Sequence, residues 1–200
     1  MDLLEPMSSI AERIFTVPEV AFVAGVPDKI VQREIDAGIV DALPGEEARA
    51  VGFPDVLYLA VVRDLRTGLA PKMRADLRRR IADALRRQAR TVRLGVFTTR
   101  LDRVEGRLRA RLRALEKVDA HIVSRAGVRA GEPVIKGTRI PARLIAGLVR
   151  QGATTAELAR DYEIGPEQVE AAVLFDRLHA KRGRPAVAPI DVVRHVPPDR

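Results

Sequence analysis

The sequence predicts a mainly α-helical protein, in which basic helices join two helix-turn-helix-like modules that contain short β elements. Apolar residues recur at helical spacing along several segments of the 200-residue chain. Glycine and proline separate these segments into pairs of short helices. Aromatic residues make up only 4% of the chain and Trp is absent. Leu, Val, Ile and Ala must therefore fill the core, which suits helical packing.

The positions of glycine and proline and the distribution of charge divide the chain into four predicted parts. Residues 1–68 form an N-terminal module, 69–120 a basic connector, 121–181 a C-terminal domain and 182–200 an extended tail. The net charge of +8 is concentrated in the centre, because residues 63–117 carry 18 basic and only 6 acidic side chains. A basic centre suits a polyanion such as nucleic acid. A solvated arginine-rich helix face explains the same pattern equally well.

The N-terminal module is predicted to begin with an arm or short helix over residues 1–15. A capping box follows, in which Thr16 is the N-cap and Glu19 stands three residues later. The helix that this box starts is expected to end at Gly25.

A second helix is predicted from Pro27 to Gly38, so that the two helices and the glycine turn make a helix-turn-helix. Residues 49–53 are expected to form a small wing strand, and residues 54–65 a strongly apolar helix. This order of elements resembles the N-terminal part of MerR-like regulators. The second helix mixes acidic and basic residues, so a scaffold or dimerisation element is at least as good an interpretation as a DNA reader.

The connector is predicted to contain two basic helices on either side of a short strand. Apolar residues at every fourth position indicate a helix from Pro71 to about Arg90, and alternation over residues 91–96 indicates the strand. A further helix covers residues 101–118 and carries three arginines spaced four residues apart. Like charges at that spacing favour a neutralising partner, but packed helices also tolerate them.

Residues 131–141, with the sequence GEPVIKGTRIP, have an order of residue types that is hard to obtain by chance. The two β-branched residues before Lys136 favour a short strand, Gly137 suits a positive φ, and Pro141 suits the first turn of a helix. Lys136 precedes Gly137, whereas a phosphate-binding loop has its lysine after the second glycine. The residue chemistry alone therefore indicates a β-to-α turn that fixes how a helix leaves a small sheet.

The stretch Pro-Val-Ile-Lys-Gly-Thr-Arg-Ile-Pro, followed by an apolar helix, a glycine and a second pair of helices, resembles a bacterial family of formally unassigned function. The resemblance runs from about His121 to Ala180. Members are small helix-turn-helix-like proteins, and many are encoded beside PIN-type ribonuclease toxins and act as VapB-like antitoxins. The resemblance thus implies a helical domain and an antitoxin role for this chain.

The domain is expected to continue with three helices after the turn. The first begins at Pro141 and has Leu144 among its inward residues. Thr154 and Glu157 form a capping box for the second, and Pro166 begins the third. The last two helices again have helix-turn-helix spacing, and acidic residues at the start of the third make it a poor phosphate binder.

Residues 182–200 contain four prolines and no helical period, so on their own they are expected to be extended and mobile. The run Arg182-Gly183-Arg184-Pro185 resembles an AT-hook core, which reads the minor groove. The tail also keeps apolar residues that a purely solubilising segment would lack. If the implied toxin exists, its acidic metal-binding groove would accept arginine and apolar side chains from this tail. The expected toxin-binding residues are Arg184, Val187, Ile190, Val192, Val193 and Arg194.

Nothing in the sequence assembles a catalytic or metal-binding site, so the chain is predicted not to be an enzyme and to need no cofactor. The three histidines are scattered and cysteine is absent. No apolar run reaches the length of a membrane span. Acidic residues stand where a signal peptide would be positive, so we expect a cytoplasmic protein.

We therefore expect an antitoxin that binds and inhibits a PIN-type ribonuclease toxin and that binds its own promoter DNA as a homodimer. The family resemblance implies this role, and the composition permits it. A stand-alone DNA-binding transcriptional regulator without a toxin is the alternative, and a purely structural interaction module is a third interpretation. The candidate DNA-binding residues are basic side chains in all three helical parts, namely Lys29, Arg33, Arg103, Arg107, Arg111, Lys136, Arg139 and Arg143.

Overall fold

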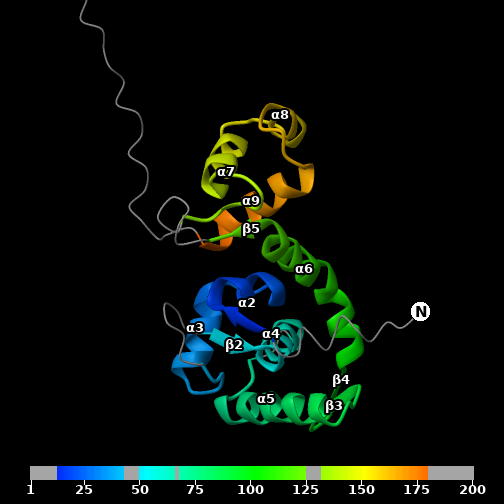
Figure 1. The fold of residues 1–200 in the computed structure, drawn as a ribbon. Helices are drawn as coiled ribbons and strands as arrows, with labels where there is room; N and C mark the ends of the chain where they lie inside the picture. The colour runs from blue at the N-terminus through cyan, green and yellow to red at the C-terminus, as the bar shows by residue number, and fades with distance from the viewer. Residues whose placement is uncertain (1–12, 43–49, 66–67, 125–131, 180–200) are drawn as a thin grey trace, which may run out of the picture.

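The computed structural model describes residues 13–42, 50–65, 68–124 and 132–179 (Figure 1). Within these ranges the protein has eight helices and three small antiparallel sheets of two strands each. This confirms the prediction of a mainly α-helical protein with short β elements.

The helices are α2 (Val17–Ala24), α3 (Asp28–Asp36), α4 (Phe53–Leu65), α5 (Pro71–Arg86), α6 (Leu101–His121), α7 (Ala142–Arg150), α8 (Thr155–Asp161) and α9 (Pro166–His179). The strand pairs are β1 (Ile14–Thr16) with β2 (Ala50–Gly52), β3 (Thr91–Leu94) with β4 (Phe97–Arg100), and β5 (Ile122–Val123) with β6 (Val134–Ile135).

The predicted capping box begins α2. The backbone N–H of Thr16 donates to the Glu19 carboxylate at 2.8 Å, and the Thr16 hydroxyl donates to the same oxygen at 3.0 Å. Gly25 ends the helix in the left-handed region, with φ of 72°. The prediction for residues 1–15 is wrong at its end, because Ile14 and Phe15 belong to strand β1. This strand pairs with β2 some 35 positions later, a long-range pairing that no local pattern predicts.

Helix α4 lies at the centre of the larger of two hydrophobic cores. All residues from Val56 to Val61 are buried, because helices α2, α5 and α6 pack around it. A helix that is apolar on every side must be enclosed in this way. The prediction of an apolar helix over residues 54–65 is confirmed with a start one residue earlier.

The connector departs from the prediction between its two helices. Helix α5 ends at Arg86 rather than about Arg90, and Gln88 adopts a positive φ of 55°. A hairpin, β3–β4, replaces the single strand expected over residues 91–96. Gly95, with φ of 57°, makes the turn, and Val96 at its tip is 94% exposed. Alternation therefore identified β3 but extended it through the turn.

Helix α6 is 21 residues long and belongs to both hydrophobic cores. Its apolar positions from Leu101 to Leu115 pack in the larger core, and Val118 packs in the smaller one. Figure 1 shows α6 running from the hairpin to the C-terminal helices, so that one rod connects the two halves of the molecule.

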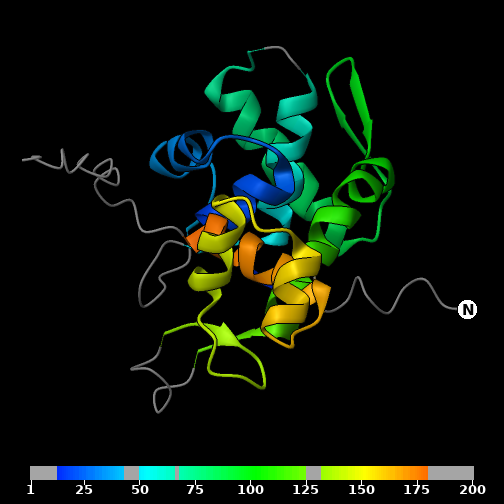
Figure 2. The ribbon, with the colours of Figure 1, turned by 90° about the horizontal axis from the view of Figure 1, so that it is seen from above.

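The smaller core lies among α7, α8, α9 and the end of α6. Helix α9 is its central element and contacts all three other helices and also α2. The expectation that Leu144 faces inward is wrong, since this side chain is 42% exposed, while Ile145 is fully buried. In Figure 2, which views the molecule from above, these C-terminal helices lie away from the β3–β4 hairpin.

We predict that Gly25→Ala destabilises the protein more than Gly38→Ala, although both glycines have positive φ. Each substitution imposes the left-handed conformation on alanine, at a cost of about 1–2 kcal/mol. A Cβ at Gly38 meets nothing within 4 Å, whereas one at Gly25 meets the guanidiniums of Arg63 and Arg111. Both guanidiniums would have to leave the backbone carbonyls to which they donate, and each such bond to a charged donor is worth about 1.5–3 kcal/mol. Urea unfolding of the two variants measures the difference, and equal losses would contradict this packing.

Candidate nucleic-acid and partner interface

The turn after β6 is closed by its own hydrogen bonds. The Thr138 hydroxyl donates to the Ile135 carbonyl at 2.9 Å and accepts from the Ile140 N–H at 3.0 Å. Gly137 has φ of 85°, which confirms the predicted positive φ. The predicted helix start differs by one residue, because Pro141 is the N-cap of α7 rather than its first residue.

Two further hydrogen bonds hold this turn against the helices around it. The Lys136 N–H donates to the His121 carbonyl at the end of α6, at 2.8 Å. The Gln168 side chain on α9 donates to the Lys136 carbonyl at 3.4 Å. The backbone groups of the turn are thus used in hydrogen bonds that fix its conformation. The side chains of Lys136 and Arg139 are exposed on this fixed backbone.

The predicted basic residues of the C-terminal domain are exposed. Lys136 and Arg139 make no ion pair within the part of the chain that the structure describes. Arg143 on α7 is exposed and pairs with Glu132. This turn therefore presents two uncompensated cations next to a third, which suits contact with an acidic surface.

The three arginines of α6 have different surroundings although they lie on one flank of the helix. Arg103 is exposed and has no ion pair among the described residues. Arg107 pairs with Asp64 on α4. Arg111 donates to the Val23 carbonyl at 3.2 Å, beside Arg63, which donates to the Ala24 carbonyl at 2.7 Å. Two of the three arginines thus have a partner within the chain. Arg111 donates to a carbonyl at the C-terminal end of α2, which has no partner within that helix.

The remaining predicted contacts on α3 are on its outer side. Lys29 and Arg33 are exposed, and Arg33 approaches the Glu34 carboxylate at 3.4 Å. The second helix of the other predicted helix-turn-helix has a different setting, because α9 is packed among its neighbours. Its acidic start is also engaged, since Glu167 accepts from Lys117 at 3.0 Å. Helix α3 thus carries basic residues on its exposed side, whereas the exposed residues at the start of α9 are acidic.

Two buried carboxylates that the sequence reasoning missed lie beneath α5. Glu34 is fully buried and accepts from the Tyr58 hydroxyl at 2.9 Å and from Arg74. Burial and the adjacent Glu34 raise the pKa of Tyr58, so the phenol stays protonated and donates. A signal for this site exists in the sequence, because Glu34 stands three residues after the buried Val31 and so shares the apolar face of α3.

Asp55 on α4 is the second buried carboxylate, and Arg78 is its partner. The Arg78 Nε donates to it at 2.7 Å, and the same guanidinium reaches Asp41 at 2.7 Å. Burial raises the pKa of Asp55, while the hydrogen bond and charge of Arg78 oppose that rise. Arg74 and Arg78 are one helical turn apart, so α5 supplies both partners from a single face.

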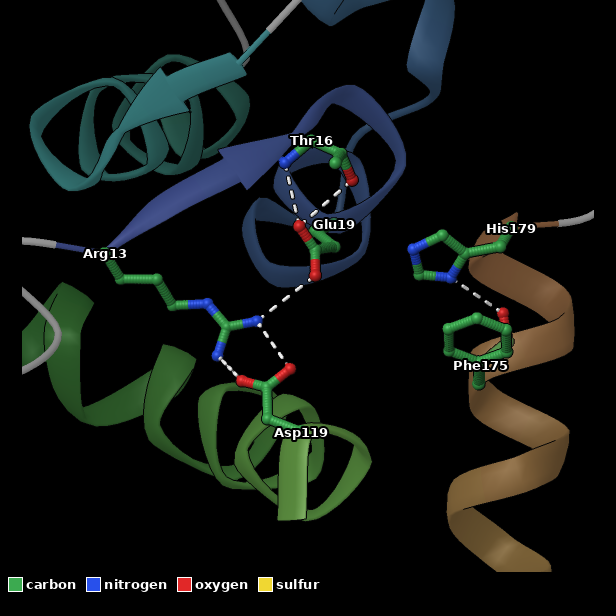
Figure 3. Close-up of polar contacts among 6 residues, drawn as sticks. All are labelled: Arg13, Thr16, Glu19, Asp119, Phe175 and His179. Carbon is green, nitrogen blue, oxygen red and sulfur yellow. Dashed lines mark hydrogen bonds and ion pairs between the residues drawn. The ribbon is translucent and has the colours of Figure 1, made fainter. Parts of the chain in front are cut away.

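Arg13 joins the start of the N-terminal module to α6 (Figure 3). It donates to Glu19 at 3.1 Å and pairs with Asp119, which lies near the end of α6. Across from this group, His179 contacts the Phe175 carbonyl at 3.0 Å and stacks on the Phe175 ring (Figure 3). The Arg13 contacts therefore hold the start of the chain's first strand against α6, whereas the His179 contacts lie within α9.

Sites of other kinds are scarce in the described ranges. A cavity of about 110 Å³ lies between α4, α5 and the hairpin, with Val61, Leu77 and Phe97 among its lining residues. It is smaller than the usual small-molecule pocket. The described residues contain no group of three or more His, Asp or Glu side chains arranged to hold a metal ion. Each of the described helices is too short or too polar to span a bilayer.

Comparison with known protein families finds a match for one region of the chain. Residues 122–175 match the family described as "Protein of unknown function (DUF433)". The DUF433 region thus starts at β5 and ends within α9, and it includes the turn described above. The predicted toxin-binding residues of the tail, from Arg184 to Arg194, lie outside the described residues.

One similar solved structure is the X-ray crystal structure of Rv2018 from Mycobacterium tuberculosis, at 18% sequence identity. The match covers 80% of this chain and 96% of that chain, with a TM-score of 0.37. So low a TM-score supports no statement about fold or function. No curated protein matches the chain.

We predict that Arg74→Ala lowers the free energy of unfolding by about 3 kcal/mol, because it leaves the buried Glu34 carboxylate without its main cation. The matched control is Arg79→Ala on the same helix, whose exposed pair with Asp76 is worth at most about 0.5 kcal/mol. Chemical denaturation with far-ultraviolet circular dichroism gives both values. Similar losses in the two variants would show that the buried pair does not hold α5.

We also predict that substitutions of Arg103 and Arg111 have different effects on the salt dependence of DNA binding and on stability. If duplex DNA contacts α6, Arg103→Gln should reduce the slope of log affinity against log salt by about 0.9. Arg111→Gln should keep that slope and lower the unfolding free energy by about 1.5–3 kcal/mol, because the Val23 carbonyl loses a charged donor. A reduced slope with unchanged stability for Arg111→Gln would instead make Arg111 a phosphate contact.

Proposed function

We propose that this chain is the antitoxin of a type II toxin–antitoxin pair, which binds and inhibits a PIN-type ribonuclease and binds its own promoter DNA. The chain would act in the cytoplasm as a homodimer or in a larger complex with the toxin. The observation that carries the proposal is the PVIKGTRIP turn, whose resemblance to VapB-like antitoxins falls within the DUF433 region. The lysine and arginine side chains of this turn are exposed, and its backbone is held by hydrogen bonds.

The DNA-binding half of the proposal is supported by cationic side chains that make no ion pair among the described residues. Several cations on the described surface make no ion pair there, among them Lys29, Arg103, Lys136 and Arg139. Acidic residues in the same region are largely engaged with other arginines, as Asp64 is with Arg107. The surplus charge is thus available to phosphates, which supply most of the affinity in DNA binding.

The toxin-binding half of the proposal assigns inhibition to residues 183–200. A PIN-type active site is a group of carboxylates that holds divalent metal, so an inhibitor must present cations and fill a groove. Arg184 and Arg194 offer bidentate guanidiniums, and Val187 and Ile190 offer apolar contacts. Eighteen residues extend to roughly 60 Å at about 3.3 Å per residue, which is enough to cross a small enzyme.

A stand-alone DNA-binding regulator is the second candidate. It is favoured by the order of α2, α3, β2 and α4, which resembles the start of MerR-like regulators, and by the exposed outer side of α3. The neighbouring reading frame discriminates between the two candidates. A small gene product with the spaced Asp and Glu residues of a PIN-type nuclease, captured by this chain on co-expression, supports the antitoxin; a neighbour without those residues supports the regulator.

We predict that deletion of residues 183–200 abolishes inhibition of the neighbouring ribonuclease, because the deletion removes every arginine assigned to its acidic groove. Circular dichroism and size-exclusion chromatography should show an unchanged fold and dimer. The control is a deletion of residues 197–200, which keeps Arg184 through Arg194 and should retain inhibition in an RNA-cleavage assay. Full inhibition by the longer deletion would move the toxin contact to the helical body, around Lys136 to Arg150.

A further inference from the structure

The β3–β4 hairpin has two chemically different faces. Its register pairs Val92 with Thr99 and Leu94 with Phe97, and this face packs toward α5 and α6. Val92 and Leu94 are buried there, which holds the ribbon in place. Because side chains alternate along a strand, the pairs between these positions point away from the core.

The outward face carries only hydroxyl and guanidinium groups. Thr91 is paired with Arg100, and Arg93 is paired with Thr98. All four residues are exposed. Arg100 forms an ion pair with Asp102 at 2.5 Å, whereas Arg93 has no ion pair among the described residues. Arg93 and Thr98 are direct cross-strand neighbours, so they present one arginine and one hydroxyl as a unit.

The segments beside the hairpin add further positive charge. Residues 86–103 contain six arginines and one aspartate. Arg87, at the end of α5, and Arg103, in the first turn of α6, are exposed and make no ion pair within the described ranges. The outward face of the ribbon is therefore bordered on each side by an exposed cation that no described carboxylate pairs with.

The hairpin also has room for a large partner. Figure 1 shows it at the end of the molecule opposite helices α7, α8 and α9, and Figure 2 shows its turn projecting free of the other described elements. Val96 at the tip is 94% exposed. Nothing in the described chain covers the outward face.

We propose that the β3–β4 hairpin is the element of this protein that reads double-stranded DNA. Its outward face enters the major groove, which is about 12 Å wide and admits a two-stranded ribbon. Arg93 and Thr98 contact base edges, since guanidinium and hydroxyl groups are common readers of bases. Arg87 and Arg103 contact the phosphates that border the groove. This inference rests on the proposed DNA-binding function and names the element that performs it.

The chemistry of the face favours DNA over an acidic protein. The core of a protein interface is formed mainly by apolar and aromatic side chains, and the outward face of the ribbon has none. An arginine beside a hydroxyl, bordered by cations, instead matches a groove whose floor carries hydrogen-bonding groups and whose walls carry phosphates.

The test measures binding of the full chain to a labelled duplex from the region upstream of its own coding sequence, and to a shuffled duplex of equal length. Fluorescence anisotropy over a range of salt concentrations gives affinity and salt slope. Arg93→Ala with Thr98→Ala should weaken binding to the upstream duplex on the order of 10- to 100-fold and change binding to the shuffled duplex little. Arg87→Gln with Arg103→Gln should weaken both and reduce the slope by roughly 0.9 per residue.

The matched control is Arg79→Gln, which removes one exposed arginine from α5 outside the ribbon and should leave the preference for the upstream duplex unchanged. Unfolding midpoints close to that of the wild type show that each variant is folded. The same measurements are made with and without the neighbouring gene product, so that a requirement for a partner is detected.

Three results would overturn the inference, and they differ in whether the proposed DNA-binding function is also overturned. If Arg93→Ala with Thr98→Ala keeps wild-type preference for the upstream duplex, or loses both duplexes equally, the ribbon does not read bases and the DNA-binding function stands. If the wild type binds neither duplex under either condition, the DNA-binding half of the proposed function fails as well. If the wild type binds no DNA and the variant no longer captures the neighbouring gene product, the ribbon is a protein contact.

Discussion

Two buried carboxylates determine where helix α5 lies. Glu34 and Asp55 come from different helices, and leaving a buried carboxylate without its partner costs about 3–5 kcal/mol, a large part of a protein's stability. Arg74 and Arg78, one turn apart on α5, answer both. The position of α5 along α4 is therefore fixed by ion pairs that permit only one register, in addition to apolar contacts such as those of Leu77. The hairpin follows α5 directly, so its position depends on the same two pairs.

Helix α6 gives the molecule its second constraint. One apolar line along it serves both cores, so the two halves cannot turn about the helix axis without exposing residues such as Leu112 or Val118. Arg13, between Glu19 and Asp119, adds a polar contact between the first strand and the far end of α6. The basic turn near Lys136 and the hairpin therefore have a fixed separation, as opposite ends of one rod.

Local signals in the sequence predicted most of the helices, because caps, prolines and apolar spacing act over a few residues. The capping boxes at Thr16 and Thr154 and the positive φ of Gly137 were predicted correctly for this reason. The pairing of β1 with β2, and the partners of arginines such as Arg74 and Arg107, depend on residues far apart in the chain. Arg103, Arg107 and Arg111 look equivalent in the sequence. Only the fold shows that Arg103 has no ion pair among the described residues, that Arg107 pairs with Asp64 and that Arg111 donates to the end of α2.

Helix α9 is the last described element, and it packs in both cores. Val169 and Ala172 belong to the smaller core and Leu178 to the larger one, while Arg177 lies over the Phe22 ring of α2 at 5.1 Å. A processive protease that engages the chain beyond His179 must pull this helix out first. That step empties part of each core at once, so neither half retains a complete core on its own. Removal of this one fourteen-residue helix would therefore disturb both halves of the molecule together.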